Sequence, residues 1–174
     1  MSQESLQLLL DSMLGRLARW LRLLGYDAAY ERDADDLHLA HRARAEGRIL
    51  LTRDHALAAR RGLKSVLITS QKLEEQIEQV REVLGPPPEP ALSRCNRCNV
   101  PLRAVSREDV ADRVPPYVLR THDAFRRCPE CGRVYWAGTH LEHMSEQVDA
   151  VAELLNKDHC SSDSPEQRPW SEKG

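Results

Sequence analysis

Short apolar runs and longer amphipathic stretches take turns along residues 6–84. The short runs, at residues 6–10, 27–30, 48–52 and 64–69, are typical of buried strands. The stretches between and after them, at residues 14–24, 36–46, 55–61 and 73–84, carry apolar residues at helical spacing. Glycine follows each predicted helix, at positions 25, 47, 62 and 85. The alternation predicts an α/β fold with a parallel sheet, in strand order 2-1-3-4.

Acidic residues follow three of the predicted strands. Asp11 follows the first, Asp54 the third, and Asp33, Asp35 and Asp36 the second. Parallel strands end at a common edge, where ligands bind, so these carboxylates are expected to gather there. Like charges at one edge favour a hard cation such as Mg²⁺ or Mn²⁺. Asp36 fits equally well as the N-cap or first-turn acid of a helix that binds nothing, and Asp33 or Asp35 is an alternative ligand.

Prolines 86–88 and 90 predict a stiff spacer and a domain boundary. The expected organisation is an α/β domain over residues 1–85, a linker over 86–91 and a cysteine-containing unit over 92–143. A helix is expected at 144–157. Residues 158–174 are rich in Ser, Pro and Glu, which predicts disorder.

Two Cys-x2-Cys pairs mark the unit after the linker. Four thiolates at this spacing predict a closed tetrahedral Zn²⁺ site with a structural role, and a disulfide or redox pair is the weaker reading. Asn99 and Gly132 suit the left-handed turns of such pairs. The 29 residues between the pairs exceed the usual ~15–20, so a hairpin or loop insertion is expected there. The predicted zinc ligands are Cys95, Cys98, Cys128 and Cys131, with His122, His140 and His143 as substitutes that the pattern does not require and Cys160 as an inert thiol.

Composition narrows the class of protein. The chain has 174 residues, of which 30% are charged and 5% aromatic. It contains no apolar run of the ~20 residues that a membrane span needs, and its start lacks a secretory signal, so a cytoplasmic or nuclear protein is expected. The net charge of −2 conceals a basic segment, residues 92–140, with 9 arginines and 5 acids. Arginine matches phosphate oxygens, although genome composition would explain the same excess.

Basic and aromatic side chains suggest contacts with nucleic acid. Arg16, Arg19 and Arg22 lie three apart on the predicted helix at 14–24; we expect the first two to contact phosphate and Arg22 to face solvent. Arg53, beside Asp54, is expected to contact phosphate as well. Trp136 could stack on an unpaired base, unless it and Tyr135 form the core of the cysteine unit.

These motifs, in this order, resemble one family. Residues 11–25, 36–43 and 48–54, followed by Arg94-Cys95-x2-Cys98-Asn99 and Cys128-x2-Cys131-Gly132-x-Val134-Tyr135-Trp136-x-Gly138-x-His140, resemble the PIN-like ribonuclease domain at the C-terminus of Mut-seven exonucleases. The resemblance covers residues 6–143. It implies a PIN-like parallel sheet with flanking helices, a small zinc-ribbon unit, and metal-dependent cleavage of RNA by Asp11, Asp36 and Asp54. The chain departs from the pattern at Thr69 and Ser70, where PIN nucleases have a fourth acidic or polar group, and at Leu141, where an aromatic residue is frequent.

The favoured hypothesis is a ribonuclease that depends on Mg²⁺ or Mn²⁺ and uses its zinc ribbon to bind RNA. The alternative is a non-catalytic RNA-binding or adaptor module, and either could work with a nuclease domain or another protein partner. A phosphoacceptor domain of the response-regulator type also has Asp at strand ends. It is disfavoured because Lys64 and Lys72 are poorly placed for its required lysine.

Overall fold

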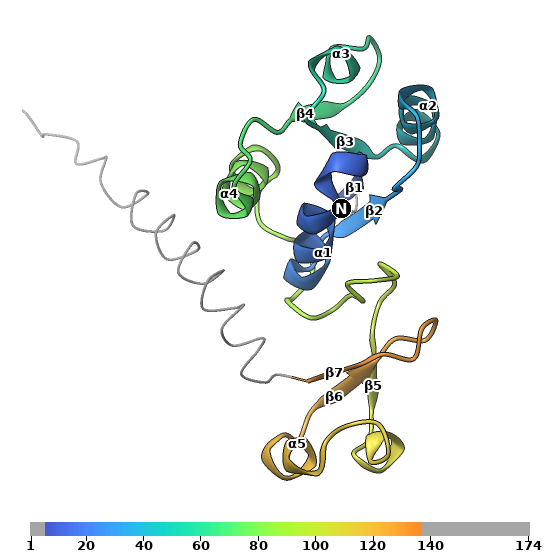
Figure 1. The fold of residues 1–174 in the computed structure, drawn as a ribbon, viewed down its shortest axis with the longest axis vertical. Helices are drawn as coiled ribbons and strands as arrows, with labels where there is room; N and C mark the ends of the chain where they lie inside the picture. The colour runs from blue at the N-terminus through green and yellow to red at the C-terminus, as the bar shows by residue number, and fades with distance from the viewer. Residues whose placement is uncertain (1–5, 137–174) are drawn as a thin grey trace, which may run out of the picture. The chain divides into compact units, whose positions relative to one another are not determined.

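A four-stranded parallel sheet forms the first half of the computed structural model, which describes residues 6–136. The strands run in the order β2-β1-β3-β4 (Figure 1). Leu10 lies in register with both Tyr30 and Leu51, so three strands end at one edge of the sheet. The predicted parallel sheet and strand order are confirmed. The strands are β1 (Gln7–Leu10), β2 (Asp27–Tyr30), β3 (Ile49–Thr52) and β4 (Ser65–Leu67).

Helices follow the strands, as the sequence predicts. They are α1 (Gly15–Leu24), α2 (Asp36–Glu46), α3 (His55–Ala58) and α4 (Leu73–Leu84). A 3-10 turn, η1 (Ser12–Leu14), precedes α1 because the Asp11 carboxylate caps it. Helix α3 is shorter than predicted. Only Leu57 of this helix is buried, and the Arg60 and Arg61 that follow offer no apolar side chain to extend the contact.

Hydrophobic residues fill both faces of the parallel sheet. Leu8, Leu9 and Leu10 of β1 are all fully buried, and successive side chains of a strand point to opposite faces. Leu9 packs with Leu39 of α2 and Leu57 of α3 on one face. Helices α1 and α4, which contact each other, cover the other face (Figure 1). The sheet therefore leaves its strand ends as the accessible part.

A second sheet follows the proline-rich segment. It is antiparallel, in the order β5-β6-β7. The predicted insertion between the cysteine pairs is present. It contributes two of the three strands, a 3-10 turn and a short helix, and its apolar cluster of Val110, Val114, Val118 and Phe125 packs on this sheet. We call residues 92–136 the ribbon. Its elements are β5 (Arg103–Val105), η2 (Glu108–Val110), α5 (Pro116–Thr121), β6 (Phe125–Arg127) and β7 (Val134–Trp136).

The proline-rich segment packs against the end of α1. Gly25 has a φ of +102°, and a Cβ placed there would lie 2.0 Å from the carbonyl oxygen of Glu89. The Leu92 amide donates to the Leu23 carbonyl at 2.8 Å. The described residues, 6–136, all belong to one compact unit. The predicted domain limits at 85, 91 and 143 stay predictions, and the predicted helix at 144–157, the tail, His140, His143 and Cys160 lie outside the described residues.

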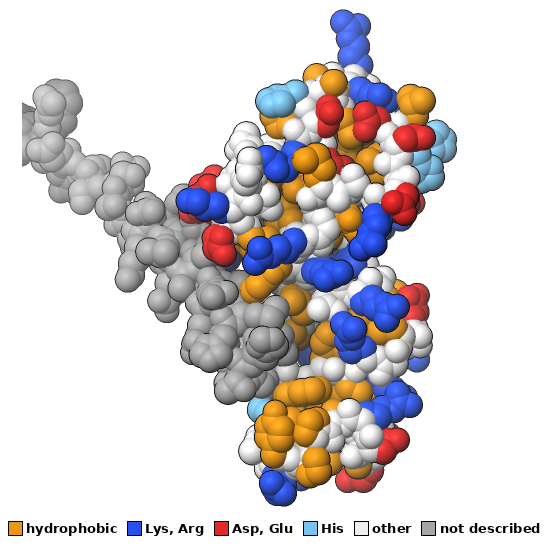
Figure 2. Space-filling model, viewed as in Figure 1, with side chains coloured by type: hydrophobic (Ala, Val, Ile, Leu, Met, Phe, Trp, Pro, Cys, Tyr) orange, Lys and Arg blue, Asp and Glu red, His pale blue; other side chains and the backbone are white. Residues whose placement is uncertain are grey.

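Charged side chains are unevenly distributed over the surface. Figure 2 shows Lys and Arg side chains gathered over the region where α1 adjoins the ribbon. Within residues 6–136, no helix is long and apolar enough to cross a membrane.

Candidate active site and metal centre

Four cysteines of the ribbon converge to form the cysteine cluster, which consists of Cys95, Cys98, Cys128 and Cys131. Their sulfur atoms all lie within 4.8 Å of one another, and the Sγ atoms of Cys95 and Cys131 are 3.7 Å apart. A tetrahedral zinc ion with Zn–S bonds of 2.3 Å requires sulfur separations of about 3.8 Å. The cluster therefore fits the predicted structural zinc ion.

The two halves of the cluster share one backbone conformation, and we name them the first knuckle (residues 95–100) and the second knuckle (residues 128–133). In the first, the Asn99 amide donates to the Cys95 carbonyl at 2.9 Å; in the second, the Gly132 amide donates to the Cys128 carbonyl at 3.0 Å. Asn99 has a φ of +66° and Gly132 a φ of +69°. The left-handed turns predicted at these two residues are confirmed.

The thiols of the cluster differ in their surroundings. Burial raises the pKa values of Cys98 and Cys128. For Cys95 burial acts in the same direction, but hydrogen bonds from the Tyr135 hydroxyl, at 3.0 Å, and from backbone amides outweigh it and lower the pKa to about 7. Tyr135 is thus part of the buried cluster. Trp136 is half-buried against the apolar cluster of the ribbon, and its stacking on RNA stays a prediction.

Asp11 lies at the carboxyl end of β1 with only 5% of its surface exposed. Its Oδ1 atom accepts from the Met13 amide at 2.7 Å, and its Oδ2 atom accepts from the Arg53 amide at 3.2 Å and from the Thr52 hydroxyl. A carboxylate has about four lone-pair sites, so these three donors leave one site, on Oδ1. The carboxylate is fixed in place and keeps one position for a ligand.

Thr52 connects Asp11 to Asp54. Its hydroxyl, which is fully buried, donates to Asp11 and accepts from the Asp54 amide at 3.0 Å. Asp54 is exposed and caps α3 by accepting from the Leu57 amide at 2.8 Å. We call Asp11, Thr52 and Asp54 the aspartate edge. Thr52 was not among the residues predicted for the site, although its position between Leu51 and the Arg53-Asp54 pair places it at the strand end.

The aspartates of the second strand lie on α2. Asp35 is the N-cap, accepting from the His38 amide at 2.7 Å, and Asp36 is the exposed first-turn acid. Within residues 6–136, the four cysteines form the only group of three or more potential ligands close enough to share an ion. The structure therefore links Asp11 with Asp54 and does not bring Asp36 into a three-aspartate cluster.

Thr69 and Ser70 do not supply a fourth group. Thr69 contacts Gln79 and Ser70 contacts Glu75, both residues of α4.

Of the predicted phosphate-binding arginines, only Arg53 is adjacent in the chain to residues of the aspartate edge, between Thr52 and Asp54. Arg16 and Arg19 are exposed on α1. The Arg53 Nε atom is buried and has no hydrogen-bond partner among the described residues. That donor is available for an acceptor which the chain itself does not provide there.

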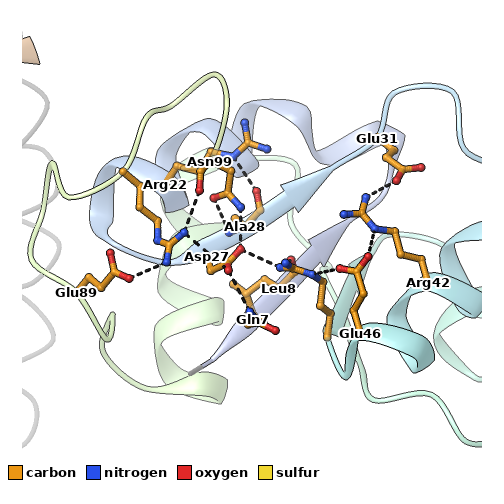
Figure 3. Close-up of polar contacts among 12 residues, drawn as sticks. Gln7, Leu8, Arg22, Asp27, Ala28, Glu31, Arg42, Glu46, Glu89 and Asn99 are labelled. Atoms are coloured by element: carbon orange, nitrogen blue, oxygen red, sulfur yellow. Dashed lines mark hydrogen bonds and ion pairs between the residues drawn. The ribbon is translucent and has the colours of Figure 1, made fainter. Parts of the chain in front are cut away.

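Arg22 does not face solvent, which corrects the prediction. Only 6% of its surface is exposed, and it donates to the Ala28 carbonyl at 2.7 Å (Figure 3). It also donates to the carbonyls of Asn96 and Arg97 at 3.0 and 2.9 Å. Burial lowers its pKa against the raising effect of the nearby thiols and Asp27. The stripe of arginines suggested an exposed face, but the first knuckle, over 70 residues away in sequence, covers this one.

Asn99 of the first knuckle pairs with β2, the edge strand. Its Oδ1 atom accepts from the Ala28 amide at 3.0 Å, while its Nδ2 atom donates to Asp27 at 2.7 Å (Figure 3). Asp27 also accepts from Arg48 at 2.8 Å. Burial raises the pKa of Asp27, but the bonds from Arg48 and Asn99 prevail and hold it below its usual value. Arg22 donates to the Ala28 carbonyl, and Asn99 accepts from the Ala28 amide. Side chains therefore satisfy both backbone polar groups of Ala28, which lies on the edge strand.

Comparison with known families agrees with this arrangement of sheet and cysteine cluster. A family model described as the Mut7-C RNAse domain matches residues 6–148. The chain belongs to the Mut7-C family. Neither the curated proteins nor the solved structures contain a match. The resemblance seen in the sequence is thus confirmed, and the Mut7-C assignment indicates a function of the ribonuclease type.

Proposed function

We propose that this Mut7-C domain is a ribonuclease that depends on Mg²⁺ or Mn²⁺ and cleaves RNA at the aspartate edge. The observation that carries the proposal is the hydrogen-bonded link between strand ends. Buried Asp11 is bonded to the Thr52 hydroxyl, which in turn accepts from the Asp54 amide. The Asp11 carboxylate and the Asp54 backbone, at the ends of neighbouring strands, are thereby joined through one hydroxyl in a domain of a ribonuclease-type family.

The donor set suits a metal that RNA helps to bind. Mg²⁺ in nucleotide-processing sites is commonly held by one or two carboxylates together with water and substrate phosphate. Asp11 offers one lone-pair site on Oδ1, and the exposed Asp54, whose Oδ1 caps α3, keeps its Oδ2 for a ligand. The exposed Asp36 carboxylate would be a further ligand. When bound, the ion would lower the pKa of water and stabilise the charge on the leaving oxygen.

Cations around the edge would hold the RNA backbone. The unpartnered Nε atom of Arg53 can donate to a phosphate oxygen, and Arg16 and Arg19 present exposed charges on the helix that begins after Asp11. The ribbon, held by structural zinc, would add its arginines and Trp136 to the binding surface.

Cleavage of labelled single-stranded RNA by zinc-loaded protein in Mn²⁺ tests the proposal. Asp54→Asn keeps the helix cap, because Asn caps as well as Asp, yet removes the charge. We expect it and Asp11→Asn to reduce the rate roughly 100-fold or more. Asp112→Asn, at an exposed acid of the ribbon, is the matched control and should cleave like wild type.

Equal cleavage by Asp11→Asn, Asp54→Asn and wild type would refute the assignment of the edge. RNA retention without cleavage by wild type in either metal would instead favour a non-catalytic binding module.

A further inference from the structure

A cavity distinct from the aspartate edge lies between α1, the end of β2 and the two knuckles. Its volume is about 310 Å³, within the range of ~300–1,000 Å³ typical of ligand pockets. Four of its seven lining residues are arginines and none is acidic. We call it the arginine cavity; its arginines are Arg19, Arg22, Arg97 and Arg133.

The arginines of the arginine cavity have no carboxylate partner within hydrogen-bond distance in the described part of the chain. None of its four arginines forms an ion pair with a carboxylate of residues 6–136, whereas Arg42, Arg48 and Arg94 each do. The buried Arg22 donates only to carbonyls, and Arg133 donates to the Asn96 amide oxygen at 3.3 Å. Gathering four like charges costs free energy that a bound anion would offset.

The position of the cavity connects it to the aspartate edge. Tyr30, which lines the cavity, is the last residue of β2 and lies in register with Leu10, the residue before Asp11. Its hydroxyl donates to the Ser12 carbonyl at 3.0 Å. A Cβ at Gly15 would come within 2.7 Å of the same hydroxyl, so the turn after Asp11 and the wall of the cavity are in contact.

We propose that the arginine cavity binds a backbone phosphate of the RNA strand whose neighbouring phosphodiester lies at the aspartate edge. The identity of the ligand as RNA rests on the proposed ribonuclease function. Guanidinium groups match phosphate oxygens with paired donors, and several of them around one cavity bind a phosphate without reading its base.

The cysteine cluster is coupled to this cavity. Arg22 is held by the carbonyls of Asn96 and Arg97, both inside the first knuckle, and Arg133 belongs to the second. The knuckle backbone thus sets where three of the four guanidinium groups lie. The cysteine cluster, which would hold a structural zinc ion, would thus act on RNA binding through the shape of this cavity.

Fluorescence anisotropy of labelled single-stranded RNA on the full chain tests the proposal. The double variant Arg97→Gln with Arg133→Gln changes two exposed side chains of the cavity. We expect it to weaken binding about tenfold or more and to reduce the slope of log K against log salt by about 0.7, the value for one single-strand phosphate contact. The control, Arg61→Gln with Lys64→Gln, removes the same charge from exposed positions between α3 and β4 and should change affinity less than about twofold.

The outcomes separate this proposal from the nuclease proposal. Equal weakening by the two double variants would overturn the cavity, as would a wild type that does not bind RNA. If wild type binds RNA without cutting it and only the cavity variant loses affinity, the cavity stands and the nuclease falls. If wild type cuts RNA and the cavity variant binds RNA as tightly as wild type, the cavity proposal is refuted and the nuclease proposal stands.

A second comparison tests which phosphate is bound. RNA with a 5′-hydroxyl should bind as tightly as RNA with a 5′-phosphate, because an internal phosphate is the ligand. If wild type preferred the 5′-phosphate and the cavity variant lost that preference, the cavity would bind the 5′ end of the RNA and the proposal of an internal phosphate would be overturned.

Discussion

Replacement of Thr52 by valine removes the hydroxyl that joins the two halves of the aspartate edge. Valine keeps the shape of threonine, so the fully buried site stays filled. The change deletes one hydrogen bond to the Asp11 carboxylate and leaves the Asp54 amide without its acceptor. The perturbation is therefore almost purely polar.

The magnitude follows from these two bonds. A hydrogen bond to a charged group contributes about 1.5–3 kcal/mol, and the lost acceptor of a partly buried amide costs about 1 kcal/mol more. The added methyl group in a buried position returns about 0.8 kcal/mol. We expect Thr52→Val to lower the free energy of unfolding by about 2–3 kcal/mol. Thr52→Ser keeps the hydroxyl, loses one methyl, and should cost only about 1 kcal/mol.

Urea unfolding of the three proteins measures this difference. With a slope of ~1–3 kcal/mol per molar, the midpoint of Thr52→Val should fall by about 1 M or more, and that of Thr52→Ser by clearly less. If packing alone mattered at this position, the order would reverse, because valine fills the site and serine does not. A serine variant less stable than the valine variant would refute the proposed link between Asp11 and Asp54.

Three further predictions concern the junction between the sheets. Gly25→Ala should lower the free energy of unfolding by more than ~2 kcal/mol, because φ is positive and a Cβ would meet the Glu89 carbonyl at 2.0 Å. Asp27→Asn should lower the free energy of unfolding at pH 7 relative to wild type. The pKa of Asp27 is depressed in the folded state, so the stabilisation from its ionised carboxylate is fully present above about pH 4 and is lost as the pH falls further. Chelation of zinc should speed hydrogen exchange in β6 and β7 by orders of magnitude while β1 and β3 stay protected.

Each of these predictions has a control and a contradicting result. Gly47→Ala, with a φ of +66° but no atom within 4 Å of the new Cβ, should cost only about 1 kcal/mol, and equal losses at the two glycines would contradict the contact with Glu89. Parallel curves of stability against pH for wild type and Asp27→Asn would contradict the role of Asp27. Unaltered exchange in the ribbon after chelation would show that the cysteine cluster does not hold it.

The sequence predicted those parts of the fold that depend on local pattern. Short loops and alternating apolar periods implied the parallel order β2-β1-β3-β4, and the paired Cys-x2-Cys spacing implied a cluster that the structure contains. The left-handed backbone conformation of Asn99 and Gly132 could be predicted because Asn and Gly adopt a positive φ more readily than other residues.

The parts that pattern did not predict depend on partners distant in sequence. Thr52 meets Asp11 across 41 positions, and Arg22 meets the carbonyl of Asn96 across 74. Nothing near Arg22 in the sequence indicates that the first knuckle covers it. The spacing of three between Arg16, Arg19 and Arg22 therefore predicted a solvent-exposed position for Arg22. Asp36 was assigned to the metal site by the family resemblance alone. The structure places it in the first turn of α2, where an acid is favourable without any metal.

The rate of RNA cleavage as a function of Mn²⁺ concentration, in protein whose zinc content is held constant, tests the central claim most directly. The account predicts a rate that rises to saturation with Mn²⁺ in wild type and stays at background in the double variant Asp11→Asn with Asp54→Asn, at equal RNA binding. Cleavage that is independent of Mn²⁺, or that the double variant retains, would contradict it.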